Sequence, residues 1–569
     1  MSVVAPTMSV VRILVTRRPD GRYLFRPPDS VPAEHIHTTD LDPDDAAELV
    51  GDWENAYAPR WVFSAVEHDY PPLLSRGTRV GRCTDLALTE YLLLAHAERH
   101  GEPRGLAAAY ARARGLPPSA DSGVHHHDTD DAPTLFELHR FDLPPGIDPR
   151  DAVETVLADQ ERRLREVTHP QRLRLLIAAE SASALAAAEM SADGLPWNAD
   201  VHRALLTELL GPRPLSGQRP PKLAELAERI TAAFGGRPVN PDHPGSVVRA
   251  LRREGIDVSS ARAHVLRHID HPAIPPLLEY KELSRLYSAH GWAWLDQWVR
   301  DGRFRPVYVV GGVVSGRWAS RGGAALQIPK LLRGCVRADP GWTLVVADAA
   351  QLEPRVLAAL SGDRRLAEVS ADTDLYTSLA RAMFGRMPIE DDRARAKIAM
   401  LSAMYGGTSG EAAPLLALLR RHFPHAVSFV ESAAREGERG GVVRSRLGRT
   451  SPPPSEAWRA ITSGDDAGTA RRAARDWGRF TRNFVVQASA ADWTAVLLAT
   501  LRRRLPAPAR LVFFQHDEVL VHCPAELTEQ VRDCLAASVS EATALVFGPS
   551  CPVRFPMPAT AVEVYADAK

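Results

Sequence analysis

The chain has 569 residues, of which 45% are hydrophobic and 24% charged, so it is long enough for several domains with substantial cores. Its formal net charge of −1 excludes binding to nucleic acid through an overall positive charge, and any such binding must come from local basic grooves. The five cysteines are scattered and lack Cys-x-x-Cys spacing, which argues against a disulfide framework or a zinc site and predicts a reduced, cytoplasmic protein. No apolar run reaches the length of a membrane span and the first residues lack a signal-peptide layout, so we expect no membrane partner.

Arginine outnumbers lysine throughout, because only five of the 69 basic residues are lysines. They are Lys222, Lys281, Lys330, Lys397 and Lys569. A compact ammonium suits some chemistry better than a guanidinium, so each lysine is a candidate for a chemical role. Random retention explains any single one equally well.

The first 115 residues alternate strand-like and helix-like segments. Strands are predicted over Val10–Val15, Tyr23–Arg26 and Trp61–Ser64, and a helix over Leu86–Arg99, which together indicate a small α/β domain. A polar stretch, 115–133, follows and contains His125, His126 and His127. Three consecutive histidines do not share one face of a helix or strand, so we interpret this stretch as a linker and not as a metal site.

Helical patterns continue from about residue 150 to 297. Helices are predicted over 150–167 and 173–190, and the region 198–297 is helix upon helix with Pro-rich joints. Its segment 275–286 (PPLLEYKELSRL) carries two cations, Lys281 and Arg285. An ordinary solvated helix face is one explanation of them.

Two apolar strands that end in aspartate dominate the second half of the chain. One strand is predicted over Leu344–Ala347, ends at Asp348, and leads through a turn to an apolar helix that starts near Gln351. A hairpin is predicted over 511–523, with His516-Asp517-Glu518 at its tip. Two carboxylates at strand ends could share a pair of Mg²⁺ ions, as phosphoryl transfer requires. Either aspartate alone is more typical of a turn or a helix cap.

Two further segments repeat chemically useful side chains every four residues, which places them on one face of a helix. The first stripe contains Arg393, Lys397, Leu401 and Tyr405, and its cations could bind a triphosphate. The second contains Arg479, Asn483 and Gln487. Polar side chains of this kind can contact the minor-groove acceptors that every base pair shares.

In their order, these segments resemble the motifs of DNA polymerase family A, the bacterial DNA polymerase I family. The family's D-Y-S-Q-I-E-L-R is matched by 348–355 (DAAQLEPR), and its H-D-E by 516–518. The motif R-x-x-x-K-x-x-x-F/Y-G-x-x-Y-G resembles 393–406, and R-x-x-x-N-x-x-x-Q-G-T-A-A-D resembles 479–492. Weaker matches are Ser315-Gly316-Arg317 to T-G-R, 326–329 (LQIP) to L-Q-N-I-P, and 440–455 to T-x-x-G-R-R-R-x-L-P. The resemblance covers roughly residues 270 to 555.

This resemblance implies an α/β and α+β multidomain protein, a right-hand polymerase with palm, fingers and thumb and with an N-terminal RNase H-like exonuclease-type domain. The implied domains are 1–150 (exonuclease-like), 151–304 (thumb and connecting helices), 305–363 (palm), 364–484 (fingers) and 485–569 (palm).

The resemblance also implies roles for individual residues. Asp348 and Asp517 would hold two Mg²⁺ ions, Arg393 and Lys397 would bind the β and γ phosphates, and Lys397 would also give a proton to the leaving pyrophosphate. Glu353 matches the residue that blocks a ribose 2′-hydroxyl, and the remaining substrate contacts would be Gln351, Leu401 and Tyr405. The DNA contacts would be Arg317, Arg479, Asn483, Gln487, His516 and Lys281. Glu518 would assist locally and not bind metal.

The chain departs from the family pattern at several positions. Leu401 replaces an aromatic residue, which removes a stacking surface for the incoming nucleotide. Ala349 and Ala350 replace Tyr-Ser, Ser402 and Ala488 replace glycines, and Pro354 is expected to stiffen the turn after Glu353. The C-terminal residues lack the family's usual ending.

The N-terminal domain has lost the exonuclease pattern. Its first strands carry no Asp-x-Glu pair, and no Tyr-x-x-x-Asp motif is recognisable. Asp69 resembles one remaining ligand, but without partners it is better explained as a surface or capping residue. We interpret the domain as a degenerate, inactive exonuclease-like fold.

The sequence therefore predicts a monomeric, cytoplasmic DNA-directed DNA polymerase. Its partners would be primer-template DNA and deoxynucleoside triphosphates, its cofactor two Mg²⁺ ions, and its role repair or gap filling without proofreading. A catalytically impaired, polymerase-like DNA-binding protein is the alternative, since several family residues are changed. A nuclease that acts through the N-terminal domain is a third reading, disfavoured by the missing carboxylates.

Overall fold

The computed structural model describes residues 11–28, 40–121, 143–321, 328–385, 390–407 and 410–568. The predicted His125–His127 linker and the LQ of the 326–329 segment lie outside these residues. The chain forms two compact units. Unit 1 comprises Met1–Ala192, Tyr308–Ala319 and Val345–Thr560, and unit 2 comprises Asp193–Val307, Ser320–Leu344 and Ala561–Lys569. These units divide the chain at other places than the predicted domain boundaries, which stay a prediction.

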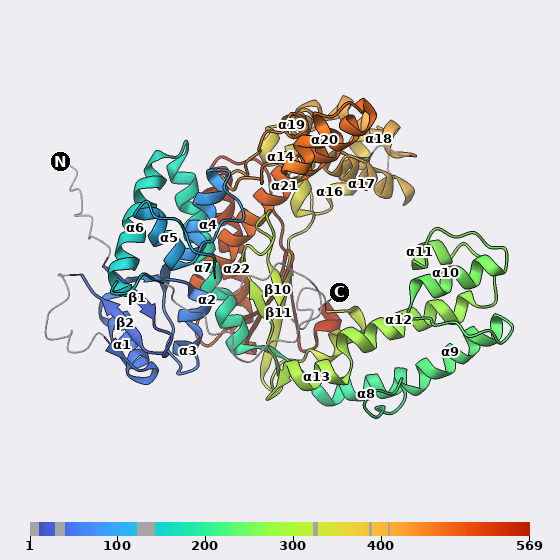
Figure 1. Ribbon diagram of the computed structural model, residues 1–569, viewed down its shortest axis with the longest axis horizontal. Coiled ribbons are helices and arrows are strands. Elements are labelled where there is room, and N and C mark those ends of the chain that lie inside the picture. The colour runs from blue at the N-terminus through green and yellow to red at the C-terminus, as the bar shows by residue number, and fades with distance from the viewer. Residues whose placement is uncertain are drawn as a thin grey trace. The chain divides into compact units, whose positions relative to one another are not determined.

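The N-terminal part of unit 1 contains a mixed five-stranded sheet in the order β3-β2-β1-β4-β5. The strands are β1 (Arg12–Arg17), β2 (Tyr23–Arg26), β3 (Asp40–Leu41), β4 (Arg60–Phe63) and β5 (Arg82–Asp85). β1 is antiparallel to β2 and parallel to β4, and β4 is parallel to β5. The helices are α1 (Pro43–Tyr57), α2 (Val66–Asp69), α3 (Pro71–Leu74), α4 (Leu86–His96), α5 (Leu106–Ala113) and α6 (Pro149–Glu166) (Figure 1). The α/β pattern predicted for this region is therefore present.

Unit 2 is mainly helical. Its helices are α8 (Ala199–Leu210), α9 (Pro221–Ala233), α10 (Pro244–Arg253), α11 (Ala263–Leu266), α12 (Ile274–His290) and α13 (Trp292–Trp298). Proline occupies the first turn of α9, α10 and α12, where its missing N–H has no helical partner to lose. Three short strands, β6 (Leu195–Pro196), β7 (Val299–Arg300) and β8 (Arg303–Phe304), form a sheet in the order β6-β8-β7. Two 3₁₀ helices, Lys330–Cys335 and Tyr565–Ala568, complete the unit.

A four-stranded sheet carries the two predicted strand-end aspartates. Its order is β12-β13-β11-β14, with β11 at Trp342–Asp348, β12 at Arg510–Gln515, β13 at Glu518–Pro524 and β14 at Ala559–Val562. β12 and β13 are antiparallel, and Gln515 pairs with Glu518, so only His516 and Asp517 form the hairpin loop. The predicted strands and hairpin are confirmed. A separate pair, β9 (Val307–Val309) and β10 (Ala319–Arg321), lies earlier in the chain.

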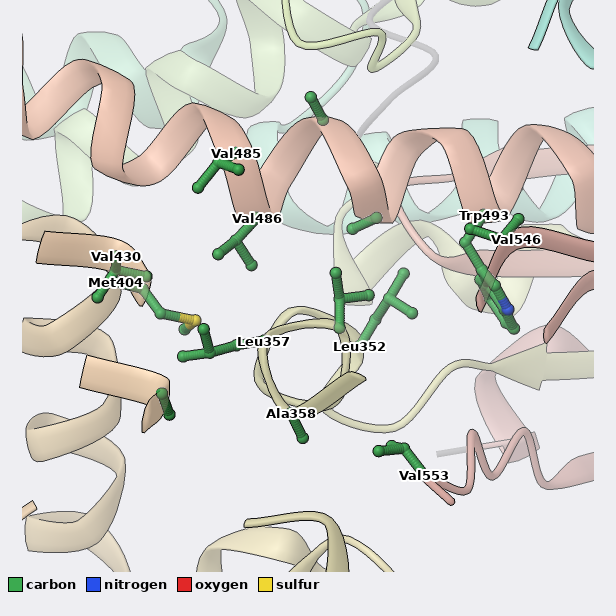
Figure 2. Close-up of a cluster of buried hydrophobic side chains, with 14 of the residues drawn as sticks. Leu352, Leu357, Ala358, Met404, Val430, Val485, Val486, Trp493, Val546 and Val553 are labelled. Carbon is green, nitrogen blue, oxygen red and sulfur yellow. The ribbon is translucent and has the colours of Figure 1, made fainter. Parts of the chain in front are cut away.

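The later helices of unit 1 pack around one hydrophobic core. They are α7 (Pro170–Asp193), α14 (Leu352–Ser361), α15 (Arg364–Val369), α16 (Leu375–Phe384), α17 (Glu390–Tyr405), α18 (Ala412–His422), α19 (Pro424–Glu438), α21 (Ala467–Arg504) and α22 (Thr528–Phe547). A further helix, α20 (Glu456–Thr462), has no buried residue. Figure 2 shows Leu352 and Leu357 of α14 near Val486 of α21, with Met404 of α17 and Val430 of α19 beside them. The core therefore connects α14, the helix that follows Asp348, to α17 and α21, the helices that carry the two predicted stripes.

In the part of the chain that the structure describes, two helices are long and apolar enough, by length and composition, to cross a membrane, which the sequence reasoning did not expect. They are α7 and α21, and 67% and 89% of their most apolar windows are buried inside the protein. The core helix of a protein outside membranes passes the same test, and both helices contribute many residues to the core described above.

Candidate active site

The two strand-end aspartates come together because β11 and β13 are neighbours in the sheet. The carbonyl of Asp517 accepts a hydrogen bond from the N–H of Ala349 at 3.1 Å, so the hairpin loop is fixed beside the residue after Asp348. His516 has a positive φ of 57°, as a two-residue hairpin loop requires. The loop thus presents Asp517 next to the end of β11.

The electrostatics of this pair favour a bound cation. Burial and the negative charge of Asp348 raise the pKa of Asp517 to about 6, while the Arg317 cation opposes that shift. Two close carboxylates repel each other when both are ionised, and a hard divalent cation relieves that repulsion. Among the described residues no group of three or more His, Cys, Asp or Glu side chains could hold a metal ion. The donor set is therefore a carboxylate pair that fits Mg²⁺ only as a partial cage, with the remaining ligands from water or substrate.

Glu353 links three segments of the site. Its Oε1 accepts a hydrogen bond from Arg317, and its Oε2 accepts one from the hydroxyl of Tyr405 at the end of α17. Burial and the Glu353 carboxylate raise the pKa of the Tyr405 hydroxyl, so it stays a donor. The structure thus brings together a predicted DNA contact, Arg317, and two predicted substrate contacts, Glu353 and Tyr405.

Gln351 caps α14 and makes its contacts within the protein. It has a positive φ of 49°, and its Oε1 accepts from the N–H of Leu375 and from Arg355, each at 3.3 Å. Its predicted substrate contact stays a prediction. Pro354 follows Glu353 within the first turn of α14, and the expected stiffening of the turn after Glu353 stays a prediction.

Arg355 is a residue whose importance the sequence reasoning missed. It is fully buried and donates hydrogen bonds to the carbonyls of Ala350, Ser370, Asp372, Thr373 and Arg554. Burial lowers its pKa to about 10. An arginine on the otherwise apolar face of a helix is the sequence signal that could have revealed this anchor.

Helix α17 presents its predicted stripe with different degrees of exposure. Arg393 donates to Asp374, the N-cap of α16, with Nε to Oδ2 at 2.7 Å, and its guanidinium lies 5.7 Å from the ring centre of Tyr376. Lys397 is exposed, and among the described residues it forms no ion pair. Leu401 is partly buried and packs against the core, so it offers little free surface.

Helix α21 carries the second stripe at its middle. Arg479 is exposed and pairs with Asp476, and a Cβ on Gly406 would lie 2.8 Å from Cγ of Arg479, so the end of α17 packs on this side chain. Asn483 and Gln487 are half-buried, and Oδ1 of Asn483 is buried with no hydrogen-bond partner in the described part of the chain. His516 is exposed, and partial burial of its ring and the Arg317 charge lower its pKa.

Unit 2 contains Lys281, which was predicted as a DNA contact. It also contains a basic cavity that the sequence reasoning did not identify. Lys281 is half-buried on α12. The cavity, of about 220 Å³, lies between the end of α9 and α10, and its lining includes Arg237, Arg249 and Arg253. Arginines at positions 249 and 253 are four apart on one helix face, which is the signal that could have revealed it.

In the N-terminal domain, Asp69 is buried, so its interpretation as a surface residue is wrong. Its carboxylate accepts from Ser64 Oγ at 2.6 Å and from the N–H of Ala65 at 3.3 Å, and burial raises its pKa to about 6. Asp85 is also buried and accepts from the N–H groups of Val66 and Leu88, both at 2.8 Å. Both carboxylates already serve local structure.

Comparison with known proteins places the chain in a family. Among curated relatives, it is 30% identical over 310 residues to the thermostable DNA polymerase I of Thermus aquaticus, which covers 50% of this chain and 35% of that protein. It is 28% identical over 348 residues to DNA polymerase I of Chloroflexus aurantiacus, covering 54% and 36%. The chain thus spans only about a third of the length of these relatives.

A solved structure shares the fold over nearly the whole chain. It is the POL domain of Pol1 from M. smegmatis in complex with DNA primer-template and dNTP, with a TM-score of 0.72 and 18% identity, covering 98% of this chain and 96% of that one. This confirms the mixed helix and sheet polymerase fold, whereas the exonuclease type of the N-terminal domain stays a prediction. The model of "DNA polymerase family A" matches residues 221–558, which is more than half of the chain. The chain therefore belongs to DNA polymerase family A.

Proposed function

We propose that the chain is a DNA-directed DNA polymerase that adds deoxynucleotides to a primer 3′-hydroxyl opposite a template. The observation that carries this proposal is the pairing of Asp348 and Asp517 at adjacent strand ends, close enough that one carboxylate raises the pKa of the other. Membership of family A supports it, and so does the likeness to a polymerase domain that binds primer-template and dNTP.

Asp348 and Asp517 would hold two Mg²⁺ ions, because a half-buried carboxylate pair with no third His, Cys, Asp or Glu ligand among the described residues leaves coordination positions for substrate oxygens. When bound, such ions activate the primer hydroxyl for attack on the α-phosphate and stabilise the departing pyrophosphate. Lys397 would neutralise the β and γ phosphates and give a proton to the pyrophosphate oxygen, and its exposure leaves the ammonium accessible.

The other side chains would position the two substrates. Arg393 would reach the triphosphate after it leaves Asp374. Glu353 would exclude a ribose 2′-hydroxyl, with Gln351, Leu401 and Tyr405 around the incoming nucleotide. The proposed DNA contacts are Arg317, Arg479, Asn483, Gln487, His516 and Lys281, and the cavity arginines of unit 2 are suited to a backbone phosphate.

We further propose that the enzyme lacks proofreading and fills gaps during repair. The order β3-β2-β1-β4-β5 with its mixture of directions is compatible with a fold of the RNase H type. β1 and β2 carry no Asp-x-Glu pair, and Asp69 and Asp85 are already engaged by neighbouring main-chain N–H groups. A labelled single strand incubated with Mg²⁺ should therefore stay intact, and its degradation from the 3′ end would contradict this part.

Primer extension tests the main proposal. A recessed primer-template is incubated with Mg²⁺ and four deoxynucleotides, and the wild type is compared with Asp517→Ala. The control is Asp200→Ala, which changes a carboxylate with a 93% exposed side chain on α8. We expect template-directed extension by the wild type and the control, and none above background by Asp517→Ala.

The alternative is a catalytically impaired DNA-binding protein. Leu401 packs against the core at a position where the family has an aromatic residue, and this observation favours the alternative. If the wild type binds primer-template but extends it with neither Mg²⁺ nor Mn²⁺ at any salt concentration, this alternative replaces the proposal.

A further inference from the structure

A buried ion cluster in unit 1 is formed by residues other than the carboxylate pair. Arg449 donates from Nε to Oδ1 of Asp492 at 3.0 Å and from Nη2 to Oε1 of Glu180. The three side chains are 1%, 0% and 2% exposed, respectively. They come from α7, α21 and the turn 445–449, in which Ser445 Oγ donates to Oδ2 of Asp492 at 2.5 Å. A guanidinium between two carboxylates in this setting is rigidly held.

The guanidinium lies directly against a glycine of another segment. A Cβ on Gly316 would be 2.4 Å from both Cζ and Nε of Arg449, so no side chain fits there. Gly316 also has a positive φ of 85°. On the same segment, a Cβ on Gly311 would lie 3.5 Å from Oε2 of Glu180. The cluster therefore supports both ends of the turn 311–316.

This turn carries Arg317 into the active site. The turn is closed by hydrogen bonds from the N–H of Gly316 to the carbonyl of Val313 at 2.7 Å and from the N–H of Val313 to the carbonyl of Arg317 at 3.1 Å. Arg317, the next residue, donates to Glu353, and its charge opposes the rise in the pKa of Asp517 and lowers the pKa of His516. A displacement of the turn would move this cation relative to three active-site groups.

We propose that Arg449 is a positioning residue for Arg317. Its guanidinium, fixed by Glu180 and Asp492, forms the surface on which Gly316 rests, and this contact sets where Arg317 meets Glu353 and the primer end. The inference rests on the proposed polymerase function for its effect on synthesis. It also has a purely structural part, the support of the 311–317 turn in the free protein.

The test compares Gly316→Ala and Arg449→Lys with matched controls. Gly77→Ala controls for backbone strain, because Gly77 has the same φ of 85° but nothing within 4 Å of its added Cβ. Arg502→Lys controls for loss of a buried bidentate pair, because Arg502 holds Glu189 at 2.7 and 2.8 Å. All variants are analysed for fold by circular dichroism and for kcat and KM in single-nucleotide extension.

We expect Gly316→Ala and Arg449→Lys each to lower kcat/KM by about tenfold to a hundredfold, since small displacements of positioning groups have effects of that order. In the double variant, the fold-decrease in kcat/KM should be smaller than the product of the two single decreases, because both substitutions remove the same contact. Gly77→Ala and Arg502→Lys should retain wild-type kcat/KM. Equal behaviour of Gly316→Ala and Gly77→Ala, or a stability loss in Arg449→Lys with unchanged kcat/KM, would overturn the proposal.

Hydrogen exchange in the free protein separates this inference from the proposed function. We expect the amides of 312–317 to exchange faster in Arg449→Lys than in the wild type and in Arg502→Lys. If the wild type synthesises no DNA but this exchange difference is found, the proposed function fails while the support of the turn by Arg449 stands. Unchanged exchange at the turn would refute that support whether or not DNA is made.

Discussion

In this site, the position of a carboxylate is fixed by the cation or hydroxyl group that donates a hydrogen bond to it. Glu353 accepts hydrogen bonds from both Arg317 and Tyr405, so each of its oxygens is already fixed in the free protein. A carboxylate held in this way has a defined position, which is what exclusion of a single hydroxyl group requires. The proposed discrimination against ribonucleotides is therefore a property of a three-residue network and not of Glu353 alone.

Replacement of Glu353 tests this network. Glu353→Ala should raise the kcat/KM for a ribonucleotide relative to the matching deoxynucleotide by about tenfold or more, because the excluding group is gone. It should also lower deoxynucleotide incorporation, since Arg317 and Tyr405 lose their common partner. Single-nucleotide extension with each sugar type measures the ratio, with the exposed Glu368→Ala as control. An unchanged ratio would show that another residue selects the sugar.

At the scale of elements, an ion pair links α16 and α17, which also share the hydrophobic core of unit 1. Asp374 caps α16 by accepting from the N–H of Tyr376 at 3.2 Å, and the same carboxylate binds Arg393 of α17. Arg355 fixes the residues just before this cap through the carbonyls of Asp372 and Thr373. For the triphosphate contact proposed for Arg393, this side chain must exchange Asp374 for the phosphate when a nucleotide binds.

This competition predicts opposite effects for the two partners. Arg393→Ala should raise the KM for deoxynucleotides by about tenfold or more, because a charge-assisted contact to phosphate is lost. Asp374→Asn should lower that KM, because Asn still caps a helix but holds Arg393 less strongly. Titration of KM in primer extension measures both. A raised KM in Asp374→Asn would mean that the ion pair prepares Arg393 for the nucleotide and does not compete with it.

The elements show what the sequence could and could not reveal. Strands β11, β12 and β13 and the stripes on α17 and α21 were predictable, because apolar runs and four-residue spacing are local signals. The partners of these residues were not predictable in this way. Glu180 and Arg449 are 269 positions apart, and nothing in the local pattern of either segment indicates that they meet. Asp69 shows the same limit, since its burial depends on how its neighbours pack.

At the scale of the whole molecule, we expect the stability of the two units to depend differently on pH. In unit 2, His202 and His290 lie among Trp197, Trp294 and Phe304, and Nε2 of His202 lies 3.0 Å from the carbonyl of His290. Burial lowers the pKa of both histidines to about 4. Each therefore stays neutral in the folded state at pH values where an unfolded histidine would take up a proton.

The consequence is a loss of stability of unit 2 in acid. The folded-state pKa of about 4 lies below the unfolded value of 6.5, so the unfolded state binds more protons between these values. Each neutral histidine therefore contributes up to about 3 kcal/mol to the free energy of unfolding of unit 2. This contribution is complete above pH 6.5 and is lost as the pH falls toward 4. His290→Phe, which keeps a ring against Trp294 and removes the titrating group, should flatten this dependence.

Urea unfolding is measured at pH 7.5 and at pH 5. Hydrogen exchange at the same two pH values then compares the protection of α8 and α13 in unit 2 with that of α14 and α21 in unit 1. In the wild type, protection in unit 2 should fall more than in unit 1 when the pH is lowered. His290→Phe should retain more of its unit 2 protection at pH 5, whereas the exposed His264→Gln should behave like the wild type. Equal losses in both units would mean that they unfold as one cooperative body, because a local protonation event would then destabilise the entire chain to the same extent.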